Sequence, residues 1–309
     1  MSLPTEAGLH LGGQTSSLWL HLGGIGFQPV ILLAAQPFTT QPPPAAHHST
    51  TNPPHPKAPM KVVCFANNTV GLESVRHLRK AGTEIVALVV HEPAKQKRTT
   101  EIIAAANLPQ ENIFTASQLS DAATLEQIAA LKPECGLSAF FGYILKQPTI
   151  DLFPRGIVNL HTSLLPLHRG SYPNVWTIVD QTAAGATMHL VDKGVDTGPI
   201  LAQNQIPLFP DDTGLSLNQR LETAAVELLQ SNWSKFVSGE LQPLPQDDSL
   251  ASLHRASDTA NIDRIDLDAT VRAGDLIDVL RARTFPPHRG AYFEVDGQRY
   301  FLELKIEKE

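Results

Sequence analysis

The chain of 309 residues is poor in cysteine, in long apolar runs and in basic residues. Cys64 and Cys135 are its only cysteines, too few for a disulfide framework or a four-cysteine zinc site, and no Cys-x-x-Cys motif occurs. No run of about 18 or more apolar residues is present, so no membrane span is predicted. The 24 Lys and Arg are outnumbered by 31 Asp and Glu, which disfavours nonspecific electrostatic binding to nucleic-acid phosphates. These absences predict a reduced, cytoplasmic protein.

Charge is scarcest at the start of the chain. Residues 1–59 contain Glu6 and Lys57 as their charged residues, together with ten of the 24 prolines. Such a composition is typical of disordered chain, and no Lys or Arg precedes the short apolar run at 30–35 as a signal peptide would require. We expect residues 1–59 to be a disordered or spurious leader, with Met60 as the natural start.

Continuous apolar runs alternate with helical patterns after residue 60, which predicts an α/β fold: a Rossmann-like, mostly parallel sheet with helices on both faces. A Ser216–Gln219 capping box is predicted for a long helix. No G-x-G-x-x-G motif follows the first strand, so a dinucleotide site is not predicted. The expected strands are 61–66, 84–90, 136–141, 157–161, 186–191 and 200–206.

A polar, Pro-rich stretch at 239–249 predicts a linker. We therefore divide the chain into a catalytic domain, 60–240, and a small C-terminal domain, 241–309. The second domain is expected to hold a helix over 271–283 and a β-hairpin of two strands, 291–295 and 300–306, whose turn is Asp296-Gly297.

Three polar side chains suggest the chemistry. Asn159 and His161 are two apart, so they share one face of a strand, and they stand at its carboxyl end, where open α/β sheets bind ligands. Asp196 lies in a loop between Gly194 and Gly198. An amide, an imidazole and a carboxylate suit attack by an amine on a carbonyl: the amide donates to the oxyanion, the imidazole moves the proton, and the carboxylate orients the imidazole.

Each of these residues also has a purely structural explanation. Asn159 could cap the strand end, His161 could be a satisfied core histidine, and Asp196 could be a turn residue. Ser163 is not in a G-x-S-x-G elbow. His161, His168 and His189 lack metal-ligand spacing, so no metal is predicted.

Taken together, the motifs Asn159-x-His161, Ser163-Leu-Leu-Pro166, Arg169-Gly170 and Asp196-x-Gly198 resemble the formyltransferases that use 10-formyltetrahydrofolate. The resemblance covers about residues 60–240 and implies that the Asn, His and Asp form the catalytic triad, with 10-formyltetrahydrofolate as co-substrate. Thr162 departs from the pattern, since the family commonly has Pro there. The folate-binding residues it implies are Gly142, Ile144, Leu145, Ser163, Leu164, Leu165, Pro166 and Asp192.

The resemblance leaves four acceptors: glycinamide ribonucleotide, methionyl-tRNA, a nucleotide-linked amino sugar, and water. The C-terminal tail argues against the first, and the absence of a regulatory domain in the Pro-rich leader argues against the last. Residues 241–309 hold nine Lys or Arg against thirteen Asp or Glu, a poor surface for tRNA phosphates. Residues 172–176 and 281–301 are similar to sugar N-formyltransferases.

We therefore predict an amino-sugar N-formyltransferase that has no membrane partner, with a homodimer left open. Methionyl-tRNA formyltransferase is the alternative, and a folate- or nucleotide-binding protein without turnover is a third. The acceptor-binding residues expected are Arg169, Gly170, Asn174 and Trp176, although Arg169 could equally be a surface residue and Trp176 a helix core residue.

Overall fold

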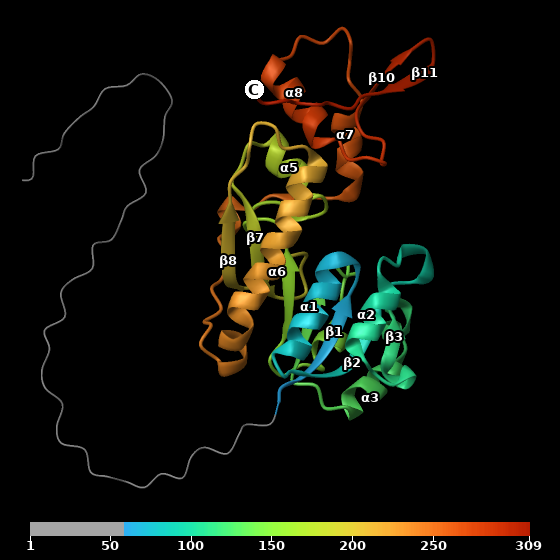
Figure 1. The fold of residues 1–309 in the computed structure, drawn as a ribbon, viewed down its shortest axis with the longest axis vertical. Helices are drawn as coiled ribbons and strands as arrows, with labels where there is room; N and C mark the ends of the chain where they lie inside the picture. The colour runs from blue at the N-terminus through green and yellow to red at the C-terminus, as the bar shows by residue number, and fades with distance from the viewer. Residues whose placement is uncertain (1–58) are drawn as a thin grey trace, which may run out of the picture. The chain divides into compact units, whose positions relative to one another are not determined.

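The structure is a computed structural model, and it describes residues 59–309. The predictions made for the leader fall outside this range. The described part contains a seven-stranded sheet in the order β3-β2-β1-β4-β5-β7-β8 (Figure 1). The five strands from β3 to β5 are parallel, and β7 and β8 are antiparallel to their neighbours. The strands are β1 (Lys61–Ala66), β2 (Glu84–Val90), β3 (Ile113–Thr115), β4 (Cys135–Ala139), β5 (Ile157–His161), β7 (Ala184–Leu190) and β8 (Ile200–Ile206).

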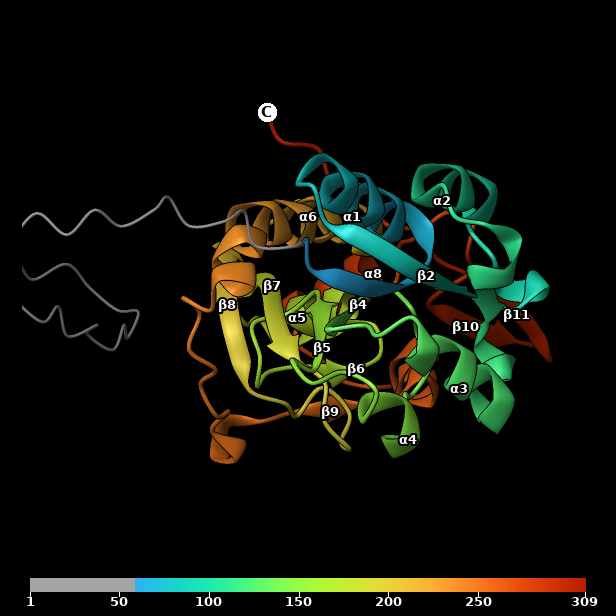
Figure 2. The same cartoon turned by 90° about the horizontal axis from the view of Figure 1, so that it is seen from below.

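Helices cover both faces of this sheet (Figure 2). One face packs against α1 (Asn68–Lys80), α2 (Thr99–Ala106) and α6 (Gly214–Ser238), and the other against α3 (Ala122–Ala130) and α4 (Gln147–Ile150). Because both faces are covered, β1 and β2 are apolar after their first residue rather than alternating. The predicted α/β fold is confirmed. None of the helices within residues 59–309 is both long and apolar enough to cross a membrane.

The C-terminal region folds against one end of this sheet domain. It contains α7 (Ala260–Asp263), α8 (Ala273–Ala282) and the hairpin β10 (Tyr292–Val295)–β11 (Gln298–Phe301). Ala282 is buried with Ile178 of α5 (Pro173–Val179) and Leu217 of α6. Before α7, the chain returns to the catalytic domain, where β9 (Leu253–His254) pairs in parallel with β6 (Arg169–Gly170).

Some predicted element boundaries are wrong. The strand expected at 136–141 ends at Ala139, because Phe140 and Gly142 have positive φ angles of 56° and 65° that turn the chain out of the sheet. The strand expected from residue 186 begins at Ala184, and β11 covers Gln298–Phe301 rather than 300–306.

The capping box predicted for the long helix is also wrong. Helix α6 begins at Gly214, and its box is formed by Thr213 and Ser216, each side chain bonding to the other's backbone N–H at 3.2 and 2.9 Å. The helix therefore starts about one turn before the predicted cap, and its first residue, Gly214, lies against the carbonyl of Ala282, where a Cβ atom would not fit.

Candidate active site

A cavity of about 550 Å³ opens at the carboxyl ends of β4 and β5, as expected for an open α/β sheet. The catalytic domain lines it with Ser138 and the turn after β4, with Asn159 and His189 on neighbouring strands, with Gly170 and Ser171, and with the loop that contains Asp196. The rest of the wall comes from residues 253–256, which belong to the segment that returns from the C-terminal region. The volume is in the range of small-molecule sites.

Asn159, His189 and Asp196 meet on the cavity wall. Asn159 and His189 are directly opposite each other in the antiparallel β5–β7 pair. The His189 Nδ1–H donates to the Leu190 carbonyl at 2.9 Å, so its Nε2 accepts from Asn159 Nδ2 at 3.0 Å. A second, longer contact of 3.5 Å joins Asn159 Nδ2 to Asp196 Oδ1. The amide therefore has one firm and one weak partner.

His161 lies behind Asp196 rather than on the cavity wall. Its Nε2–H donates to the His168 carbonyl at 2.9 Å, and its Nδ1 is 3.4 Å from Asp196 Oδ2. The imidazole is buried, with 7% of the residue exposed. The three residues expected to form a triad are thus brought together, and their catalytic roles stay a prediction.

The carboxylate of Asp196 is held by several partners. The backbone N–H of Gly170 donates to its Oδ2 at 2.9 Å, and Asp196 itself has a positive φ of 53°. Burial acts to raise the pKa of this carboxyl, but His161, His189 and the Gly170 N–H outweigh burial and hold the pKa well below its usual range. Asp196 is therefore ionised at neutral pH.

The Asp196 loop is tight and is anchored from outside. Gly194 and Gly198 leave no space for a Cβ atom, since Thr197 and the Leu190 carbonyl respectively occupy it. Gln246 Nε2 donates to the carbonyls of Asp196 at 2.8 Å and Gly198 at 2.7 Å. The stretch expected to be a linker thus supplies a structural contact to the site.

The residues expected to bind folate divide into two groups. Gly142, Ile144, Leu145 and Asp192 line the cavity, and Ile144 is 75% exposed although it is apolar. The loop 163–166 does not line it: Ser163 Oγ donates to the Leu167 carbonyl at 2.6 Å.

Asp192 has contacts within its own loop, because its Oδ1 accepts from Gly194 N–H at 2.9 Å and Thr197 Oγ1 at 2.6 Å. Its folate-binding role, like that of residues 163–166, stays a prediction.

Among the residues expected to bind the acceptor, Gly170 lines the cavity and the other three do not. Arg169 is bound to Gln246 Oε1 at 2.8 Å and to Asp248 at 2.7 Å. Asn174 donates to the Gly214 carbonyl at 2.9 Å. Trp176 is buried, and its ring stacks on His254 with centroids 4.1 Å apart. Arg169, Asn174 and Trp176 therefore contact other parts of the protein rather than the cavity.

The structure adds residues that sequence reasoning missed. His189 could have been found as a polar residue in an otherwise apolar strand. His254 and Arg255 line the cavity, and Arg255 is exposed, but nothing in the sequence links them to residues some 90 positions away. The same holds for Gln246.

Comparison with known proteins identifies the class to which this fold and site belong. The family described as Formyl transferase matches residues 60–232, more than half of the chain, and the chain belongs to this family. The predicted resemblance is thereby confirmed. A second family, described as N-formyltransferase dimerization C-terminal domain, matches residues 258–308.

The names of individual relatives refer to two different acceptors. The methionyl-tRNA formyltransferase of Chloroflexus aurantiacus is 34% identical over 203 residues, which span 63% of this chain and 64% of that protein. Among solved structures, a sugar N-formyltransferase from Shewanella sp. has a TM-score of 0.70 at 21% identity, covering 81% of this chain and 99% of that one.

An N-formyltransferase from Helicobacter canadensis, in complex with folinic acid and dTDP-3-aminofucose, has a TM-score of 0.57 at 16% identity. It covers 78% of this chain and 86% of its own. At these identities, the two structures establish the fold alone.

Proposed function

We propose that this protein transfers the formyl group of 10-formyltetrahydrofolate to the amine of a nucleotide-linked amino sugar. One observation carries the proposal: the amide of Asn159 and the ionised carboxylate of Asp196 meet on the wall of a ligand-sized cavity, with His161 directly behind them. Membership of the formyl transferase family supports the reaction type. The folate would lie along the turn formed by residues 142–145, which lines the cavity.

The geometry suggests a role for each group. The amine nitrogen attacks the formyl carbon, and the carbonyl oxygen becomes an oxyanion. Asn159 can donate to it by giving up the weak 3.5 Å contact with Asp196, while the 3.0 Å contact with His189 keeps the amide oriented. A preorganised donor of this kind contributes roughly 2.7–4 kcal/mol.

Asp196 and His161 would stabilise the charge on the attacking amine and take part in transferring its proton. The carboxylate stabilises the positive charge that develops on the amine. The His161 imidazole, held by the hydrogen bond from its Nε2–H to the His168 carbonyl, places Nδ1 3.4 Å from Asp196 Oδ2, where it can exchange a proton from that direction. The tetrahedral intermediate collapses with cleavage of the bond between carbon and N10, and the proton lost by the amine is returned to N10. The products are the formamide and tetrahydrofolate.

The charges around the cavity favour a small phosphorylated acceptor over tRNA. Of the nine basic residues in 241–309, six form ion pairs within the same region: Arg264, Arg272, Arg281, Arg283, Arg299 and Lys305. Binding to tRNA needs many basic residues that are free to neutralise phosphates. Arg255 is instead exposed on the cavity wall, where a single guanidinium can bind a diphosphate through several hydrogen bonds.

Methionyl-tRNA remains the second candidate acceptor, because the 34% identical relative carries that activity in its name. One experiment distinguishes between the two acceptors. The full chain is supplied with 10-formyltetrahydrofolate and, in parallel, with dTDP- and UDP-linked 4-amino-4,6-dideoxyhexoses or with methionyl-tRNA. Tetrahydrofolate release and the mass of the formylated product are measured at about 50 and 200 mM salt.

We expect formylation of an amino-sugar nucleotide with little loss at the higher salt. Rapid formylation of methionyl-tRNA without turnover of any sugar would overturn the choice of acceptor. Binding of folate with no tetrahydrofolate release from any acceptor would overturn the enzymatic proposal and leave a binding protein.

We also propose a homodimer formed through the C-terminal region. Residues 258–308 match a domain described by its role in dimerization, and this region exposes the apolar side chains of Leu267, Val271 and Ile277 by 60%, 56% and 46%. Light scattering coupled to size-exclusion chromatography should give twice the mass of the chain, and a monomer at micromolar concentration would contradict the proposal.

A further inference from the structure

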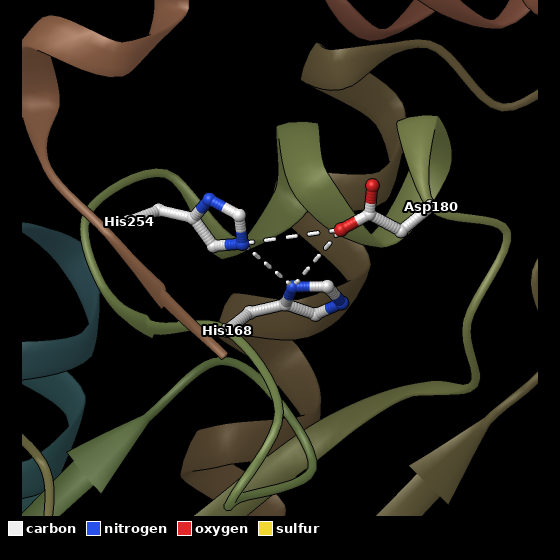
Figure 3. Close-up of side chains that lie close together, drawn as sticks. All are labelled: His168, Asp180 and His254. Carbon is white, nitrogen blue, oxygen red and sulfur yellow. Dashed lines mark hydrogen bonds and ion pairs between the residues drawn. The ribbon is translucent and has the colours of Figure 1, made fainter. Parts of the chain in front are cut away.

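Three metal-ligating side chains converge beside the active site, from parts of the chain that are far apart in sequence (Figure 3). His168 comes from the loop after β5, Asp180 from the end of α5, and His254 from β9. His168 Nδ1 is 3.4 Å from His254 Nε2 and 3.8 Å from Asp180 Oδ2, and the last two atoms are 3.9 Å apart. The sequence argument against a metal considered the spacing of His161, His168 and His189. It does not apply to this set, because Asp180 and His254 were not among those residues.

These distances are too long for good hydrogen bonds, which have donor–acceptor separations of about 2.7–3.2 Å. They are close to the separations around a metal. A tetrahedral zinc ion with ligands at about 2.0–2.2 Å holds its ligand atoms about 3.3–3.6 Å apart. Movements of a few tenths of an ångström would therefore bring all three atoms within ligand distance.

His168 is prepared to act as a ligand. Only 1% of the residue is exposed, and with Nε2–H donating to Thr182 Oγ1 at 2.6 Å, the lone pair is on Nδ1, toward the other two groups. A ring nitrogen fixed in this way by a partner on its other side is the usual arrangement of a metal-bound histidine. Burial, together with His254 and His161, lowers the pKa of His168 to about 4, so the imidazole is neutral at physiological pH.

We propose that His168, Asp180 and His254 bind a zinc ion. Two neutral imidazoles and one carboxylate form a ligand set that zinc commonly takes, with a fourth position left for water or another oxygen ligand. The Ser252 hydroxyl lies 3.4 Å from His168 Nδ1 and is one candidate for such an oxygen ligand. The Asp180 side chain is 42% exposed, which gives the ion a path from solvent.

The ion would connect the C-terminal segment to the catalytic loop. His254 belongs to the segment that lines the cavity, and the carbonyl of His168 holds His161 in place. Zinc bound to both side chains would hold these two parts of the active site together, in addition to the β6–β9 pairing. Its role would be structural, distinct from the formyl-transfer step.

The test measures zinc rather than activity. The full chain is stripped with a chelator, equilibrated with Zn²⁺ and analysed for metal content and affinity, with Co²⁺ as a spectroscopic substitute that reports tetrahedral coordination. Asp180→Asn removes the exposed ligand with little change in shape, and His254→Phe removes a ligand while keeping an aromatic ring to stack on Trp176. His288→Ala, at an exposed histidine of the C-terminal region, is the matched control.

We expect the wild type and His288→Ala to bind one more equivalent of zinc than Asp180→Asn and His254→Phe, or to bind that zinc at least about tenfold more tightly. Zinc should raise the melting temperature of the wild type and His288→Ala only. Histidines within residues 1–58 contribute equally to all four proteins. Circular dichroism in chelator checks that each variant is folded. If His254→Phe does not fold, the comparison of the wild type with Asp180→Asn tests the proposal. Equal zinc binding by the wild type and Asp180→Asn, or no binding by the wild type, would overturn the proposal.

Discussion

Gln246 donates its side-chain amide to the backbone carbonyl of Asp196 at 2.8 Å, across 50 residues of sequence. Its oxygen accepts from Arg169 at the same time. The conformation of the Asp196 loop therefore depends on a residue that follows α6, and the C-terminal segment completes the wall of the candidate site.

Gln246→Ala should weaken catalysis without unfolding the protein. Loss of hydrogen bonds to two partly buried carbonyls costs roughly 1–3 kcal/mol, and a misplaced Asp196 should lower turnover by about 5- to 100-fold, with a smaller change in KM for the folate. Steady-state kinetics and a thermal melt test this. Gln205→Ala, on the exposed part of β8, is the control, and wild-type turnover in Gln246→Ala would show that the loop holds without this contact.

Asn159→Ala and His161→Ala should each reduce turnover at least about a hundredfold, because an oxyanion donor contributes about 10²–10³ and a proton-transfer group about 10²–10⁴. Single-turnover rates with 10-formyltetrahydrofolate measure the chemical step, and circular dichroism checks the fold. If either variant keeps a rate close to that of the wild type, its proposed role is wrong.

Arg255→Ala should raise the KM for an amino-sugar nucleotide by about tenfold or more while changing turnover little. A hydrogen bond to a charged phosphate is worth about 1.5–3 kcal/mol, and Arg255 lines the cavity without being one of the three residues to which we assign a role in the transfer step. Arg272→Ala, at a side chain that is 83% exposed and paired with Asp275, is the control. The same KM for both variants would show that Arg255 does not bind the acceptor.

Acid should destabilise the fold through His168. Its folded pKa of about 4 is below the unfolded value of about 6.5, so the unfolded chain binds the proton more readily. The contribution of His168 to stability is therefore complete above about pH 6.5 and is lost as the pH falls toward 4, up to an order of 3 kcal/mol.

Urea titrations in chelator, between pH 4 and 7, should show a shallower pH dependence for His168→Gln than for the wild type. The neighbours His254, Asp180 and His161 are retained in both proteins, so the difference reports the titration of His168 together with its coupling to His254 and His161. Parallel pH profiles would contradict the buried, neutral state of His168.

The two cysteines should be inert in the native protein. Burial raises the pKa of Cys135 to about 12 and raises that of Cys64 as well, and the thiolate is the reactive form. A thiol reagent at about pH 8 should modify neither residue until denaturant is added, when both should react. Rapid labelling of the folded protein would show that the core around β1 and β4 opens.

The sequence by itself determined the parallel sheet, the identity of the formyl transferase family and the placement of Asn159 and His161 on the same face of a strand. The first follows from continuous apolar runs, and the last from the two-residue period of a strand, both of which are local properties. Short elements such as β3 and the β6–β9 pair have too few residues to show a period.

The tertiary structure alone decided which distant residues complete the site. It placed Gln246, His254 and Arg255 around Asp196, moved Asn174 and Arg169 into internal contacts, and brought His168 to Asp180 and His254. These contacts depend on where the C-terminal segment returns to the sheet, and that path is set by packing between elements far apart in sequence, which no local pattern records.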